Sequence, residues 1–307
     1  MLHIVNSYIK SIFKYQKKYI NFLTLAAGLT GMLLLSACGA RKPEDQNQKF
    51  EEYTKELFCS EVASNTINLH YTLKNPEDYG ITGSEVSLGS FESDTDMIKA
   101  SAENMWQSLQ KFSYDGLDLQ NRITFDILGY QIKTIERNAD YILYEEPLGL
   151  VSGVQTQLPV ILSEYRFYDR QDVETYLELL EMTEDYFDSL IKFEREKAEK
   201  GLFMADYALD TVLDQCRAFL DMGDGNYLYS TFADRVKDVK ELTKEEISDY
   251  IQDNALAVSD YIFPAYEKLI SALEELRGTG ENEKGLVYLP DGADYYELVV
   301  RQSTGSD

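Results

Sequence analysis

Histidine is scarce in this chain, which has only His3 and His70 among its 307 residues. His3 lies in an N-terminal segment that we expect to be removed, so the mature chain keeps one imidazole. A zinc site with two or three histidine ligands is therefore excluded within this chain alone. A Ser–His catalytic pair that does not use His70 is excluded as well.

Basic residues are also few, with 29 Lys and Arg against 54 Asp and Glu, which gives a formal net charge of −25. A surface this acidic repels phosphate backbones over a screening length of about 8 Å at physiological ionic strength. We therefore expect no nucleic-acid partner. The chain also lacks a glycine-rich phosphate loop, a nucleophile elbow and a His-Glu-x-x-His motif.

Bulky side chains, in contrast, are plentiful. Apolar residues make up 44% of the chain, and 23 Tyr and 14 Phe are among them. This composition excludes collagen-like, low-complexity and wholly disordered chains. A chain of this length has room for one large domain or for two domains of about 150 residues. We expect a folded protein with an acidic surface.

The N-terminus has the pattern of an export signal. Residues 1–37 contain four lysines and no acidic residue, and the apolar run from Phe22 to Leu35 is short for a membrane span of about 20 residues. The run Leu35-Ser-Ala-Cys38 resembles the bacterial lipobox, whose cysteine is linked to diacylglycerol and becomes the new N-terminus. The resemblance makes Cys38 the lipid attachment site and predicts anchoring to the cell membrane on its extracytoplasmic face. The alternative is an uncleaved membrane anchor.

The remaining 270 residues divide by composition. Residues 38–49 are polar and form a predicted tether. Residues 50–277 have apolar side chains at helical spacing, and this pattern predicts an all-α or mainly α, multi-helix domain. Residues 278–307 form a predicted C-terminal segment of extended or mixed structure that continues into a missing region.

Three local patterns make sharper predictions within the helical domain. Thr243 and Glu246 have the spacing of a capping box and predict a helix start. Ile123, Ile127, Tyr130 and Thr134 define the apolar face of another predicted helix. Pro264 lies inside an apolar helical pattern, which it must kink or break because it lacks an amide donor.

Two stretches interrupt the helical pattern. Residues 146–162 contain Pro147, Gly149, Gly153 and Pro159, which favour loop and extended chain. After Gly278 the sequence predicts a short extended or β segment, either a β-hairpin or a strand followed by a helix.

Few residues are candidates for chemistry. His70 is an acid–base group, a single metal ligand or, as we favour, a hydrogen-bonded histidine at the edge of the core. Glu145 and Glu146 are a carboxylate pair, but adjacent side chains usually point to different faces, so a solvated acidic turn is the favoured interpretation. Residues 221–226 lack the residue order of a calcium loop and predict a turn. We assign no catalytic and no metal-binding residue.

Cys59 and Cys216 remain in the mature chain. Two thiols in an exported protein can form a disulfide, but both fall within helical apolar patterns. We favour buried free cysteines over a disulfide.

Three stretches resemble bacterial lipoproteins of the family known as domain of unknown function 885. They are Asn65-Thr-Ile-Asn-Leu-His-Tyr-Thr-Leu-Lys-Asn-Pro-Glu-Asp-Tyr-Gly-Ile81, Gly153-Val-Gln-Thr-Gln-Leu-Pro159 and Leu289-Pro-Asp-Gly-Ala-Asp-Tyr-Tyr296. The resemblance extends from about Phe50 to the end of the chain.

Members of this family resemble largely helical proteins related to zinc metallopeptidases. Their zinc signature is a His-Glu pair followed by Pro-Gly-His, and it comes after the Tyr-Tyr segment. This sequence ends at Asp307 and contains no such motif. The resemblance therefore transfers no catalytic residue and no cofactor to this chain, and zinc is expected only if a downstream catalytic half exists.

The leading hypothesis is the N-terminal helical part of a lipid-anchored extracytoplasmic protein, inactive by itself. A natural chain that lost its catalytic half is the other explanation of the missing motif. The alternative function is a non-catalytic extracytoplasmic peptide-binding or scaffold lipoprotein, which the 12% aromatic content supports. The expected partners are the membrane, through the lipid, and either a peptide substrate or the missing C-terminal half.

Overall fold

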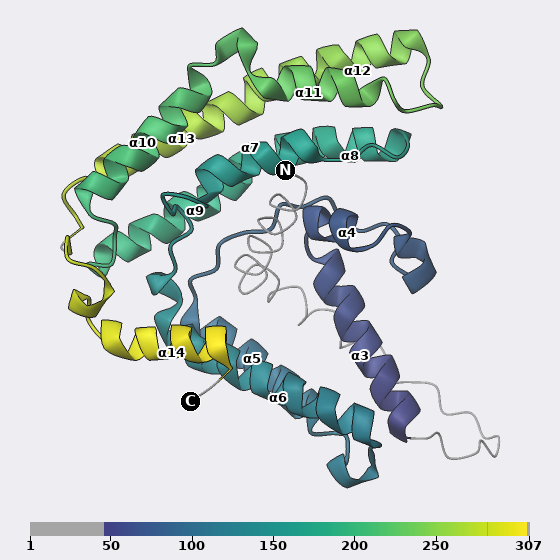
Figure 1. The fold of residues 1–307 in the computed structure, drawn as a ribbon, viewed down its shortest axis with the longest axis vertical. Helices are drawn as coiled ribbons and strands as arrows, with labels where there is room; N and C mark the ends of the chain where they lie inside the picture. The colour runs from purple at the N-terminus through teal and green to yellow at the C-terminus, as the bar shows by residue number, and fades with distance from the viewer. Residues whose placement is uncertain (1–45, 281, 306–307) are drawn as a thin grey trace. The chain divides into compact units, whose positions relative to one another are not determined.

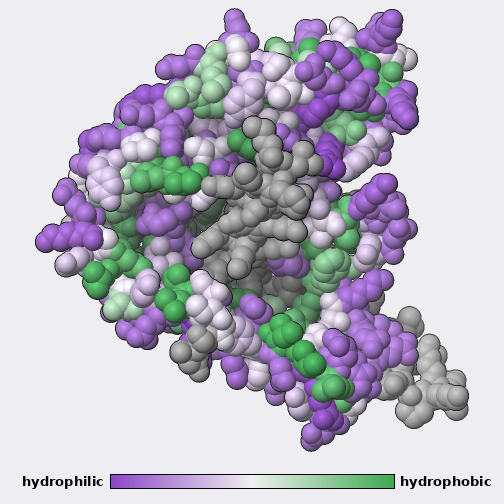
Figure 2. Space-filling view, in the orientation of Figure 1, coloured by the Kyte–Doolittle hydropathy of each residue, from purple (hydrophilic) through white to green (hydrophobic). Residues whose placement is uncertain are grey.

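The computed structural model describes residues 46–280 and 282–305, which form helices joined by turns and loops (Figure 1). No β-strand occurs in these ranges, so the predicted all-α class is confirmed. Hydrophilic side chains cover much of the face shown in Figure 2, as the acidic composition requires. The chain divides into two compact units.

The first unit contains the described residues of 46–85, 93–142 and 298–305. Its α-helices are α3 (Gln46–Ala63), α4 (Thr66–Thr72), α5 (Thr95–Leu109) and α6 (Leu119–Asn138), with the second half of α14 (Gly292–Thr304). Short 3-10 turns lie at Pro76–Tyr79 and Tyr114–Gly116. Helix α3 begins at Gln46, inside the stretch predicted as a tether.

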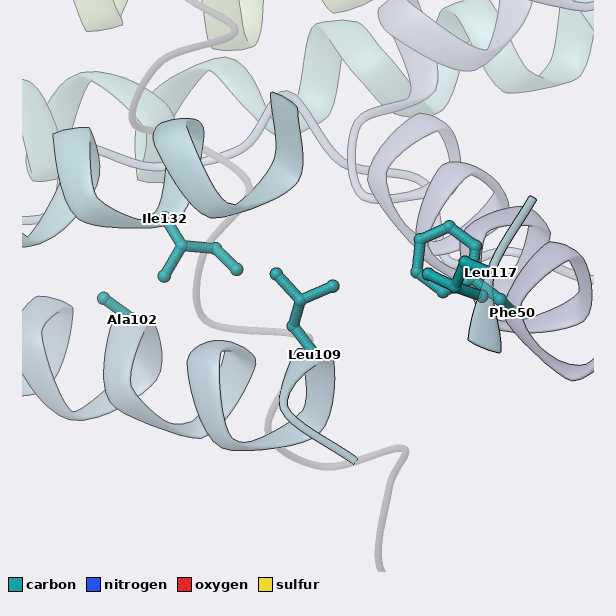
Figure 3. Close-up of a cluster of buried hydrophobic side chains, with 5 residues drawn as sticks. All are labelled: Phe50, Ala102, Leu109, Leu117 and Ile132. Atoms are coloured by element: carbon teal, nitrogen blue, oxygen red, sulfur yellow. The ribbon is translucent and has the colours of Figure 1, made fainter. Parts of the chain in front are cut away.

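The core of the first unit lies where α3, α5 and α6 meet. Figure 3 shows Ala102 and Leu109 of α5 facing Ile132 of α6, with Phe50 of α3 beside Leu117. The rings of Phe50 and Phe112 meet edge to face at 5.2 Å, a favoured aromatic geometry. The five residues drawn in Figure 3 are at most 3% exposed.

Helix α6 does not bury the face that its sequence suggested. Ile123, Ile127 and Tyr130 are 46%, 54% and 42% exposed. The buried side of α6 carries Ile132, and Leu128 and Ile135 pack against the same cluster. Both sides of this helix are apolar, so helical spacing alone could not identify the side that meets α5.

The second unit contains residues 86–92 and the described residues of 143–297. Helices α7, α8 and α9 form one layer, and α10 to α13 form another that packs on it (Figure 1). The helices are α7 (Val154–Glu164), α8 (Arg170–Glu181), α9 (Thr183–Glu199), α10 (Asp206–Leu220), α11 (Tyr227–Val236), α12 (Lys244–Ala257) and α13 (Phe263–Glu275), followed by the first half of α14.

Two of the predicted helix boundaries in this unit are confirmed. At the start of α12, the Thr243 hydroxyl accepts from the Glu246 amide, and the Glu246 carboxylate accepts from the Thr243 amide at 2.8 Å. Donation by the Thr243 backbone and side chain lowers the pKa of Glu246 to about 2. A π-helical turn at Val258–Ile262 then interrupts the pattern, and Pro264 lies in the first turn of α13, where its missing amide is tolerated.

The prediction of loop and extended chain over residues 146–162 is wrong for its second half, because α7 runs through Pro159. A proline inside a helix leaves the carbonyl four residues earlier without its amide donor. That carbonyl belongs to Gln155, and the hydroxyl of Tyr266 on α13 donates to it at 2.7 Å. The side chain of Tyr266, 107 positions after Pro159, thus replaces the hydrogen bond that this proline removes.

Tyr266→Phe is expected to lower the free energy of unfolding by about 1–3 kcal/mol, because it leaves a buried carbonyl without a donor. Tyr266 is fully buried, so water cannot replace the hydroxyl. Denaturant unfolding measures the loss. Tyr207→Phe on the exposed side of α10 is the control and should change little. Adding Pro159→Ala to Tyr266→Phe restores an amide donor and should recover stability; a double variant no better than Tyr266→Phe would contradict this account.

The C-terminal segment corrects another expectation. A 3-10 turn at Leu286–Tyr288 and helix α14 replace the predicted extended or β segment. At the turn between them, a Cβ atom on Gly292 would lie 1.9 Å from the Leu286 carbonyl oxygen, so this position requires glycine. The helix of the predicted alternative, a strand followed by a helix, is therefore present, whereas its strand is not.

Candidate functional site

The most unusual chemical group in the described residues is a charged cluster in the second unit, formed by the buried Glu194 and Lys197 with Glu146, whose side chain is 52% exposed. Both Glu194 and Lys197 are fully buried. The Lys197 ammonium lies 3.1 Å from the Glu146 carboxylate and 3.7 Å from the Glu194 carboxylate. It also donates to the Glu145 carbonyl at 2.8 Å. We call these three residues the α9 charge cluster.

Helix α9 places two members of the cluster in the core by its own periodicity. Phe187, Leu190 and Ile191 form its buried stripe, and Glu194 and Lys197 continue that stripe toward the C-terminal end. Helix α9 ends at Glu199, and Gly201 two residues later has a left-handed φ of 68°, which lets the Leu202 amide donate to the Lys197 carbonyl at 2.8 Å. Both the backbone and the side chain of Lys197 are therefore held in place.

Burial sets the electrostatics of the cluster. It disfavours ionised Glu194 and raises the pKa of that carboxyl to about 7, because the attraction of Lys197 offsets only part of the desolvation. Neither carboxylate oxygen of Glu194 has a hydrogen-bond partner within the described residues. For Lys197, desolvation is outweighed by the nearby carboxylates, and its pKa is raised. The arrangement is an ion pair of Lys197 with Glu146, beside a carboxyl that titrates near neutrality.

The cluster can hold or release one proton at Glu194 and can fix the chain at Glu145 ahead of α7. These properties define a charge cluster whose protonation responds to pH.

An open groove of about 790 Å³ lies between α9 and α13. Ion pairs cross it, with Lys268 2.6 Å from Asp188 and Arg195 2.8 Å from Glu275. These side chains are largely solvated, and exposed pairs of this kind contribute at most about 1 kcal/mol each. The groove is therefore lined mainly by solvated side chains of both signs.

The residues singled out from the sequence lie apart from the cluster, with one exception. His70 is half-buried on α4 in the first unit and meets the Tyr71 ring edge to face at 5.3 Å. Residues 221–226 form the predicted turn, in which Asn226 accepts from the Leu228 amide and begins α11. The exception is Glu146, which pairs with Lys197 instead of forming only a solvated turn.

Sequence reasoning missed Glu194 and Lys197. The available signal was the spacing that they share with Phe187, Leu190 and Ile191, since charged residues on an apolar helix stripe are candidates for burial. Charged residues are also frequent elsewhere on α9, so they did not stand out.

The structure tests the predictions for two of the three cysteines. Cys59 and Cys216 are both free, and Cys216 is fully buried. Burial raises the pKa of the Cys216 thiol to about 12. Cys38, the predicted lipid attachment site, lies outside the described residues.

Neither a metal centre nor a membrane-spanning helix is found in residues 46–280 and 282–305. No three His, Cys, Asp or Glu side chains in these ranges are grouped to hold a metal ion. No helix in them combines the length and the apolar character needed to cross a bilayer.

Comparison with protein families identifies the chain. Residues 83–307 match the family described as a bacterial protein of unknown function, DUF885. The chain therefore belongs to the DUF885 family. The matched range includes the stretches Gly153–Pro159 and Leu289–Tyr296 and begins after the stretch Asn65–Ile81. Comparison with the curated proteins finds no match.

A solved structure has a similar fold. It is the crystal structure of a "putative lipoprotein" from Colwellia psychrerythraea, with a TM-score of 0.67 and 15% sequence identity. The alignment covers 85% of this chain and 46% of that chain. This chain thus spans about half the length of the protein it matches.

Proposed function

We propose that this chain is the N-terminal helical part of a lipid-anchored extracytoplasmic protein of the DUF885 family, and that it is catalytically inert by itself. The observation that carries the proposal is the match that covers 85% of this chain but 46% of the similar lipoprotein chain. A helical part of this kind would supply packing surface and membrane attachment to a chain that continues beyond it.

The arrangement of possible metal ligands in the described residues supports the proposal that this chain is catalytically inert by itself. The zinc metallopeptidases that the family resembles need a set of ligands and a general base. The described ranges contain no grouped set of ligands, and the one charge cluster with an unusual proton affinity is closed around a lysine.

The genomic DNA after the codon for Asp307 tests the proposal. An open reading frame that encodes a His-Glu pair followed by Pro-Gly-His would support it. A stop codon immediately after Asp307 in an intact genome would overturn the assignment to a longer protein.

Cys38→Ser is expected to abolish acyl labelling and release of the mature form in cells, because the thiol at this position is the predicted acceptor of the thioether-linked lipid. Metabolic labelling with a fatty-acid analogue, followed by gel analysis, measures the loss. Cys59→Ser removes a cysteine elsewhere in the chain and should leave the labelling intact. Labelling that persists in Cys38→Ser would contradict the assignment.

A non-catalytic peptide-binding or scaffold lipoprotein is the second candidate. Exposed aromatic side chains favour it, including Tyr207, Tyr288 and Tyr296 at 62%, 63% and 59% exposure, because tyrosine provides amphipathic contact area. Calorimetric titration of the mature chain with a mixed peptide library distinguishes the two. Saturable binding without hydrolysis supports the binder, and no heat of binding supports the inert N-terminal part.

A further inference from the structure

Helix α6 exposes a second apolar face in addition to the one that packs on α5. Leu119, Ile123, Ile127 and Tyr130 are 75%, 46%, 54% and 42% exposed. Their spacing of four, four and three residues places them on one side of the helix, in a row about 16 Å long. We call these four residues the α6 stripe. In Figure 2, a row of hydrophobic side chains follows the line that α6 takes in Figure 1.

The charge of α6 differs from that of the rest of the chain. Arg122, Lys133 and Arg137 outweigh Asp126 and Glu136, so the helix has a formal charge of +1 in a chain of −25. No other α-helix of the described residues is positive by the same count. An anionic surface would therefore repel most of this protein but not α6.

The start of α6 is joined to the start of α3 by hydrogen bonds. The Asn47 side chain accepts from the Asp118 amide at 2.8 Å and from the Asn121 side chain at 3.1 Å. The Gln46 side chain donates to the Ser113 carbonyl at 2.7 Å. These contacts hold the first turn of α3 beside Leu119, the most exposed member of the stripe.

The predicted lipid attachment site is near this end of α6 along the chain. Eight residue steps separate Cys38 from Gln46, so a fully extended chain spans at most about 29 Å between them. A lipid on Cys38 would therefore keep the first turn of α3, which lies beside the start of the α6 stripe, within this distance of the bilayer surface.

We propose that the α6 stripe docks onto the lipid bilayer that holds the Cys38 anchor, with its apolar side chains inserted at the level of the headgroups. The proposal rests on the proposed lipid attachment of this chain. An apolar helix face with flanking basic residues and a tyrosine is suited to the interface, where such helices lie about 5–10 Å deep. Because the anchor already holds the protein at the bilayer, the effective concentration of the α6 stripe at the membrane surface is high, and a short apolar stripe is sufficient for binding.

Fluorescence on tethered protein tests the docking. The chain from Gly39 to Asp307 carries an N-terminal hexahistidine tag and binds vesicles of phosphatidylethanolamine, phosphatidylglycerol and a nickel-chelating lipid. Cys59→Ser removes the half-exposed thiol, while the buried Cys216 stays unlabelled. An environment-sensitive dye is then attached at Ile127→Cys. Because the tag replaces the lipid, the result does not depend on whether Cys38 is acylated.

The matched control is the same dye at Leu256→Cys. Leu256 is 52% exposed on α12, a helix with one basic and four acidic residues in the second unit. We expect a blue shift and quenching by spin-labelled lipid for the dye at residue 127, but not for the dye at residue 256. Ile123→Cys repeats the measurement if circular dichroism shows that the Ile127 variant is unfolded.

Two results would overturn the proposal. One is equal emission and equal quenching at the α6 and α12 positions on vesicles. The other is a blue shift at residue 127 without vesicles, because the stripe would then be covered by protein, such as a second copy of the chain.

Discussion

Lys197→Ala is expected to lower the free energy of unfolding by about 3–5 kcal/mol at pH 7, because it leaves the fully buried Glu194 without its cation and truncates a fully buried side chain. The substitution removes the cation beside Glu146 and Glu194, and the donor to the Glu145 carbonyl. It also leaves a cavity in the core of the second unit. Urea unfolding followed by circular dichroism measures the change.

Lys192→Ala is the matched control on the same helix. Lys192 is 71% exposed and pairs with Glu196 at 3.6 Å, so its loss should cost less than about 1 kcal/mol. The double variant Lys197→Ala and Glu194→Gln should recover part of the stability, because it also removes the carboxylate that lost its cation. Equal effects of the two lysine substitutions would contradict the role of the α9 charge cluster.

Glu194→Gln is expected to stabilise the protein at pH 8 and to change stability little at pH 5. The pKa of Glu194 is about 7 in the folded protein, above the ordinary value of 4.5. The folded state therefore binds the proton more tightly, and its contribution to stability is complete below pH 4.5 and is lost as the pH rises through 7. The difference between the two pKa values corresponds to about 3 kcal/mol of unfolding free energy. The parent protein should lose this stability as the pH rises, and the glutamine variant should not.

Denaturant unfolding at several pH values between 5 and 8 measures this effect as the difference between the parent and the variant. The difference removes the contributions of all other acidic residues, which titrate in both proteins. Glu199→Gln, an exposed position on the same helix, should leave the pH dependence of the parent unchanged. A constant difference between the parent and Glu194→Gln over this range would show that Glu194 does not exchange its proton there.

The predictable parts of the structure depend on neighbouring residues in the sequence. The capping box of Thr243 and Glu246 needs four consecutive residues, and the structure contains both of its hydrogen bonds. The turn at residues 221–226 and the interruption before Pro264 likewise follow from local backbone preferences. The all-α class follows from the same short-range periodicity over many segments.

The failed predictions depend on distant residues. Pro159 signals a helix break, and α7 continues because Tyr266 supplies a donor from α13. The α6 stripe has the spacing of a buried face, and it is exposed because α5 packs on the other apolar side. Neither outcome can be predicted from the residues of one helix alone, because each depends on a second helix that packs against it.

The candidate site divides in the same way. Residue types in the sequence are sufficient to exclude a multi-histidine zinc site within this chain and to predict a lipobox at Cys38, because both inferences depend on residue identity and order. The α9 charge cluster needs Glu146, 51 residues before Lys197, to approach the end of α9. The pKa of Glu194 then depends on how completely surrounding helices remove water from its carboxyl, which is a property of packing and not of helical spacing.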